Sequence, residues 1–115
     1  MAEATQQLVL TSFPDEATAR RIADQIVEHR LAACVSLLPG AQSVYFWEGK
    51  VQRDTEWLGL IKTSTDCYPE LERRLLAWHP YETPECLAVE ISAGSPAYLR
   101  WLQAQCGSNA SANQC

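Results

Sequence analysis

The chain has 115 residues and a mass of 12.8 kDa, which is the size of one domain. Its apolar fraction of 47% and charged fraction of 20% are those of an ordinary globular domain and argue against disorder. The formal net charge is −5 and no block of Lys or Arg exceeds two residues, so we expect no nucleic-acid partner. No apolar run approaches the roughly 18 residues of a membrane span, so we expect no membrane partner either.

The five cysteines are odd in number, widely spaced and without a C-x-x-C pair. This pattern argues against a disulfide framework and against a zinc knuckle. We therefore expect free thiols in a reducing compartment. The first seven residues contain one acid, no basic residue and no hydrophobic block, so they do not resemble a secretion signal. Together these features predict a cytoplasmic location.

The first half of the chain predicts a strand, a helix and a long hairpin. Residues 6–12 are rich in β-forming side chains, and Pro14 and Asp15 then favour a helix start. The helix should bury a stripe with spacings of three and four, made by Ala19, Ile22, Ala23, Ile26, Val27 and Leu31. A strand over 32–38 runs into Pro39-Gly40, which should kink it. Residues 42–47 and 51–63 then form a hairpin around the turn at 48–50.

The second half predicts a helix, a stiff connector, a strand and a short last helix. Thr65-Asp66 should cap a helix over 67–78, which Pro80 ends. Pro80 and Pro84 should hold residues 79–85 extended before a strand over 86–91. A short helix follows Ser95-Pro96. Residues 107–115 carry no charged or large apolar side chain, so we expect a disordered tail after a single domain over 1–106.

This order of elements predicts an α+β fold of the ferredoxin-like βαββαβ type, with helices on one face of an antiparallel sheet. The fold alone carries no function. Each hairpin arm of about 13 residues would reach roughly 40 Å, which is more than one small domain covers. Part of the hairpin should therefore pack against something else.

The connector 79–85 holds the densest group of functional side chains, including His79, Tyr81, Glu82 and Glu85. A stiff backbone suits a binding site, although the prolines could simply end a helix. The hairpin aromatics, among them Tyr45 and Trp47, suit core or subunit packing, or stacking on a ligand. Lys62 lies in an apolar arm and could cap a sheet edge or bind an anion. Cys34 suits a buried thiol or a soft ligand for copper.

Several strings of residues together resemble the CutA divalent-cation tolerance family. They cover about residues 8–102 in the order and spacing of that family: PDEATA (14–19), LAACV (31–35), PGAQSVYFWEGK (39–50), IKT (61–63), HPYETPE (79–85) and YLRWL (98–102). The resemblance implies a cytoplasmic homotrimer with long intersubunit hairpins, similar in architecture to the PII nitrogen-regulatory proteins. It also implies a non-enzymatic role in the tolerance of, or response to, copper and other divalent cations.

The resemblance further implies a copper site at three positions that here hold Thr11, Trp78 and His79, where enteric relatives have Cys, His and His. Only His79 matches. The candidate ligands for copper or another divalent cation are therefore His79, with Cys34 and Glu85 added from the residues alone.

Two alternatives use the same residues. A PII-like signalling module would bind a small anionic ligand in an intersubunit cleft with Lys62, Tyr81 and Glu82, beside Tyr45 and Trp47. A hydrolase would use His79 as a base that Glu85 orients.

Overall fold

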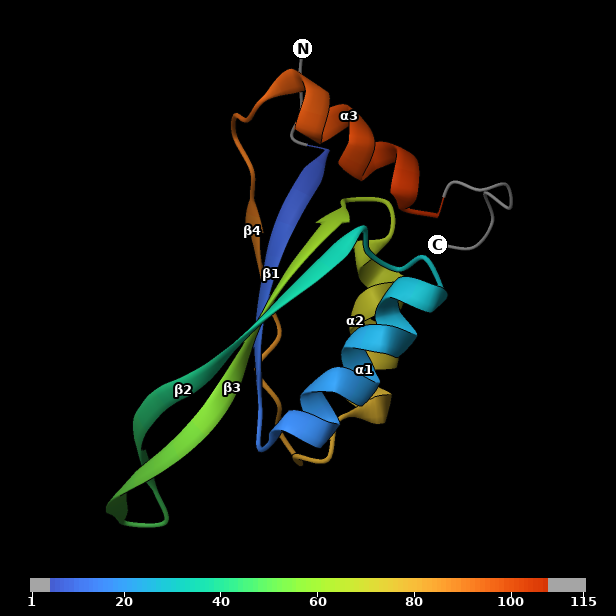
Figure 1. Cartoon of the computed structure of the whole chain (residues 1–115). Coiled ribbons are helices and arrows are strands. Elements are labelled where there is room, and N and C mark those ends of the chain that lie inside the picture. Colours follow the sequence, from blue (N-terminus) through green and yellow to red (C-terminus); the bar gives the residue numbers. More distant parts are fainter. Residues whose placement is uncertain (1–4, 108–115) are drawn as a thin grey trace.

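A computed structural model describes residues 5–107 (Figure 1). The described chain forms four strands and three helices in the predicted order. Their bounds are β1 Gln6–Phe13, α1 Glu16–Glu28, β2 Cys34–Trp47, β3 Lys50–Ser64, α2 Tyr68–Trp78, β4 Leu87–Glu90 and α3 Pro96–Gln105. The predicted α+β fold is confirmed. The tail prediction falls, from residue 108 on, outside the described residues.

The strands form one antiparallel sheet in the order β2-β3-β1-β4. Strand β1 pairs with β3 over its whole length, from Gln6 opposite Ser64 to Phe13 opposite Trp57. On its other side β1 pairs with the four residues of β4. The helices α1 and α2 lie together against one face of this sheet, and α3 lies across one end (Figure 1).

The core lies between that face and the two helices. Helix α1 begins where the Asp15 side chain accepts a hydrogen bond of 2.8 Å from the backbone N–H of Thr18. Its predicted stripe is buried except for Val27, which is 43% exposed. The ten residues of the main core are Val9, Phe13, Ala19, Ile22, Ile26, Leu31, Ala32, Ile61, Leu71 and Leu75.

Two of the predictions are wrong, one about a helix cap and one about a cysteine. Helix α2 starts after Cys67 and no side chain caps it, so Thr65-Asp66 is not the cap. Cys34, Cys86 and Cys106 are free thiols, as expected, but Cys67 is disulfide-bonded. The described residues contain no helix long and apolar enough to cross a membrane.

The other face of the sheet carries apolar side chains that neither α1 nor α2 covers. Successive side chains of a strand alternate between faces, so the residues next to the core residues along each strand point away from the helices. We call this surface the open face; its apolar members are Leu8, Leu10, Leu38, Leu58, Leu60, Leu87 and Val89. Leu38, Leu87 and Val89 are 44%, 56% and 50% exposed.

The β2-β3 hairpin extends well beyond the helices (Figure 1). Its turn consists of Glu48 and Gly49, both with positive φ, the backbone geometry that a tight hairpin turn requires. The predicted kink is present: the pairing register shifts between Leu38 and Ala41, so that Pro39-Gly40 form a bulge. Strand β2 nevertheless continues through the bulge to Trp47.

Candidate functional site

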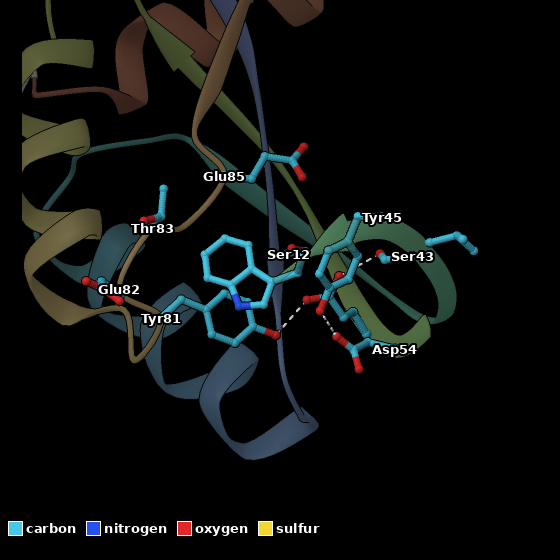
Figure 2. A pocket seen from close by; sticks show the side chains of 11 residues that line it. Ser12, Ser43, Tyr45, Asp54, Tyr81, Glu82, Thr83 and Glu85 are labelled. Atoms are coloured by element: carbon cyan, nitrogen blue, oxygen red, sulfur yellow. Dashed lines mark hydrogen bonds between the residues drawn. The ribbon is translucent and has the colours of Figure 1, made fainter. Parts of the chain in front are cut away.

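A cavity of about 600 Å³ lies between the part of the hairpin beyond the bulge and the connector after α2 (Figure 2). The end of β1 forms one wall, and the hairpin and the connector form the others. The lining residues are Ser12, Ser43, Val44, Tyr45, Trp47, Asp54, Glu56, Tyr81, Glu82, Thr83 and Glu85.

Glu56 joins the hairpin to the connector. Its side chain is only 7% exposed and accepts two hydrogen bonds of 2.6 Å, one from the Tyr81 hydroxyl and one from the Ser43 hydroxyl (Figure 2). A carboxylate with so little contact with water needs such donors. Burial, with the neighbouring Glu56 carboxylate, raises the pKa of Tyr81, so its hydroxyl keeps the proton that it donates.

A second hydroxyl–carboxylate pair lies farther along the hairpin, where the Tyr45 hydroxyl donates to Asp54 (Figure 2). This hydrogen bond raises the pKa of Tyr45. Unlike Glu56, both members of this pair are exposed.

His79 fixes the start of the connector. Its Nδ1 accepts the backbone N–H of Tyr81 at 3.1 Å, so the ring proton lies on Nε2, which donates to the backbone carbonyl of Ser12 at 2.7 Å. The ring also stacks on Phe13 with centroids 5.4 Å apart and is 6% exposed. Both ring nitrogens are therefore engaged, and in this conformation His79 positions the connector and has no lone pair free for a metal ion.

The cavity has a clear electrostatic preference. All of its charged lining residues are acidic: Asp54, Glu56, Glu82 and Glu85. No Lys or Arg of the described part of the chain lines it. The cavity therefore favours a cation and disfavours an anion.

The structure brings together most of the residues predicted to bind a ligand. Tyr45, Trp47, Tyr81 and Glu82 all line the cavity, and so does the candidate metal ligand Glu85. Lys62 does not line it.

Lys62 lies instead on the open face, with its Nζ 2.6 Å from Ser36 Oγ and 3.8 Å from Cys34 Sγ. The predicted group of Lys62, Tyr81 and Glu82 is thus not assembled within one protomer.

The three candidate metal ligands are not brought together either. Glu85 is in the cavity wall, His79 is in the core behind it, and Cys34 is beside Lys62. Among residues 5–107, no group of three or more His, Cys, Asp or Glu side chains is placed to hold a metal ion. A metal site with three protein ligands is therefore not formed by the described residues of one protomer. A copper site on these residues stays a prediction.

Sequence reasoning missed Glu56, Asp54 and Ser43. The signal that could have found them is the turn at Glu48-Gly49, which fixes the pairing of the hairpin from its tip. Counting back from that turn places Ser43 opposite Asp54 and diagonal to Glu56. The buried Glu56 then needs donors, and Ser43 is one of them.

Comparison with known proteins agrees with the fold. The profile of a family described as "CutA1 divalent ion tolerance protein" matches residues 7–105. A divalent-cation tolerance protein CutA from Thermus thermophilus is 46% identical over 102 residues, which are 89% of this chain and 99% of that protein.

Solved structures of this family have the same fold. The crystal structure of CutA1 from Shewanella sp. SIB1 has a TM-score of 0.89 and 36% identity, and the match covers 93% of this chain and 100% of that one. A CutA structure from Archaeoglobus fulgidus, called periplasmic, has a TM-score of 0.84 and 32% identity, covering 87% and 97%. On this match of sequence and fold, the chain belongs to the CutA1 divalent ion tolerance protein family.

Proposed function

We propose that this protein is a cytoplasmic, non-enzymatic homotrimer that binds copper or another divalent cation in the course of cation tolerance. The observation that carries the proposal is the cavity between the hairpin and the connector, whose charged lining residues are all acidic. Carboxylate oxygens are common ligands of divalent cations. The relatives' names supply the role in tolerance.

Glu82 and Glu85 are the side chains best placed to receive a cation. Both are exposed, whereas Glu56 already accepts two hydroxyl donors. Two carboxylates are few ligands for one ion, so we expect weak binding unless a second protomer adds donors. Of the candidate ligands from the sequence, Glu85 is the one that this arrangement keeps in the cavity wall.

Calorimetry with Cu(II), Cu(I) and Zn(II) tests the cation. We expect heat of binding for at least one ion. The affinity for that ion should fall at least about tenfold in Glu85→Gln, which keeps the shape of the side chain and removes its charge. The matched control is Glu28→Gln, an exposed carboxylate at the end of α1 and outside the cavity lining. Absence of heat with all three ions, or an equal loss in both variants, would refute direct binding at this site.

The open face supports the trimer. A row of half-exposed Leu and Val side chains on a sheet face is typical of a surface that another subunit covers. A small domain also gains most from such burial. The hairpin that extends beyond the helices in Figure 1 provides further surface for a neighbour.

Sedimentation equilibrium tests the assembly. We expect the mass of a trimer at micromolar concentration, and dissociation in Leu87→Glu, a change in the most exposed apolar side chain of the open face. The control is Leu76→Glu, a leucine 43% exposed on the outer side of α2. A wild-type monomer would contradict the proposal, as would a Leu87→Glu variant that stays trimeric.

A further inference from the structure

The cavity has an aromatic wall that a metal ion does not need. Tyr45, Trp47 and Tyr81 all line it, and Val44 adds an aliphatic surface. Aromatic rings do not ligate divalent metals in proteins, but their faces attract ammonium groups, and indole does so most strongly. The wall therefore requires an explanation besides metal binding.

Three hydroxyl groups of the cavity wall already use their protons. Tyr81 and Ser43 both donate to Glu56, and Tyr45 donates to Asp54. These three hydroxyls consequently present lone pairs to the cavity instead of protons. A ligand that meets these three oxygens and the four carboxylates has to bring donors or positive charge of its own.

The volume points to an organic ligand. Small-molecule sites are typically about 300–1,000 Å³, are largely apolar and carry a few placed polar groups. This cavity, at about 600 Å³, is of that size, which is far more than a bare metal ion fills.

We propose that the cavity binds an organic ammonium cation, with the head group between the aromatic rings and the carboxylates of Glu82 and Glu85. The alkyl part of the ligand lies along Val44 and Trp47. This inference shares with the proposed function only the preference of the cavity for cations, and it does not depend on a metal ion.

Titration of the full-length ¹⁵N-labelled protein, followed by NMR, tests the inference with three probes of equal chain length. n-Pentylammonium carries a positive head, 1-pentanol a neutral one and pentanoate a negative one. We expect saturable shifts of the Trp47 indole N–H with n-pentylammonium, identified as the indole signal that Trp47→Leu lacks. We expect at least about fivefold weaker binding of 1-pentanol and no saturation with pentanoate.

Two variants locate the site. Trp47→Leu should weaken n-pentylammonium binding about fivefold, because it removes the indole face and keeps an apolar side chain. Trp47 is 52% exposed, so the change should leave the fold intact. The matched control is Trp101→Leu on α3, 44% exposed and outside the cavity lining, which should bind as the wild type does.

Three results would overturn the inference: no saturation with n-pentylammonium, equal affinity for 1-pentanol, or equal weakening in both tryptophan variants. The first result refutes the inference also where a neighbouring protomer fills the cavity, because the cavity then binds no ligand. The calorimetry above separates the two proposals. Saturation by n-pentylammonium without metal heat would refute only the metal site, and metal heat without ammonium binding would refute only this inference.

Discussion

Tyr81→Phe tests whether Glu56 joins the hairpin to the connector. The substitution keeps the ring and removes one of the two donors to a carboxylate that is 7% exposed. A hydrogen bond to a charged group contributes about 1.5–3 kcal/mol, and a buried acceptor left without its donor costs the most. We expect the free energy of unfolding to fall by about 2 kcal/mol.

The second donor makes the test sharper. Ser43→Ala removes the other hydrogen bond of 2.6 Å to the same carboxylate. In the double variant, Glu56 loses both of its hydroxyl donors, so the loss should exceed the sum of the single losses by about 0.5–3 kcal/mol. Tyr45→Phe is the control, because its partner Asp54 is exposed and water can replace the hydroxyl; we expect a loss of about 0.5 kcal/mol or less.

Urea denaturation, followed by far-UV circular dichroism at one protomer concentration, measures all four variants. The concentration must be fixed because assembly shifts the apparent stability. The midpoint should move without a change in slope. If Tyr81→Phe costs no more than Tyr45→Phe, or if the two donor losses simply add, Glu56 does not join the two segments in the way that its contacts indicate.

Three further predictions concern the tyrosines, a close contact and a buried hydroxyl. All four tyrosines have a raised pKa, from burial or from carboxylate neighbours, so phenolate absorbance at 295 nm should appear above pH 10 in the native protein and near pH 10 in guanidinium. The folded state favours the neutral phenol, so its stability should fall as pH rises above about 10; native titration at or below pH 10 would contradict this. Gly59→Ala should cost about 1–3 kcal/mol in urea, since its Cβ would lie 2.9 Å from the buried Phe13 ring, whereas Gly94→Ala meets only the end of a leucine side chain and should cost less. Thr11→Val should stabilise by about 1 kcal/mol, because the Thr11 hydroxyl is buried without a hydrogen-bond partner among the described residues. Thr63→Val should destabilise by a similar amount, since that hydroxyl donates to a backbone carbonyl at 2.7 Å; equal effects at Thr11 and Thr63 would refute the reasoning.

The fold was predictable because its signals are local. The buried stripe of α1, the proline after α2 and the turn at Glu48-Gly49 each act over a few residues, and each is present as expected. The start of α2 was not predictable in the same way. Thr65-Asp66 has the composition of a cap, yet the backbone N–H of Cys67 bonds to the carbonyl of Ser64, which starts the helix without either side chain.

The candidate site was predictable in part. The stiff connector placed Tyr81, Glu82 and Glu85 together because its prolines act locally. The sign of the ligand's charge was not predictable from these residues. It depends on Lys62 lying elsewhere in the sheet and on Asp54 and Glu56 facing the connector, which are consequences of strand register.

The bulge at Pro39-Gly40 decides that register. Before it, Leu38 pairs with Leu58 on the open face; after it, Ala41 pairs with Glu56. Two residues of β2 thus lie opposite one residue of β3, which changes the face to which alternate β2 side chains point. Counting alternate residues from the start of β2 therefore places the hairpin aromatics on the wrong side of the strand.

The same bulge makes the cavity continuous with the open face. Because of the register change, Ser43 and Tyr45 lie on the side of the hairpin that carries Glu56, and Glu56 shares that side with Leu58 and Leu60. A protomer that covers the open face of its neighbour would therefore reach the edge of the cavity. Cation binding and assembly should then be linked: a ligand that binds the assembled form more tightly stabilises the assembly by the same free energy. Leu87→Glu should in that case weaken cation binding although it changes no residue of the cavity wall.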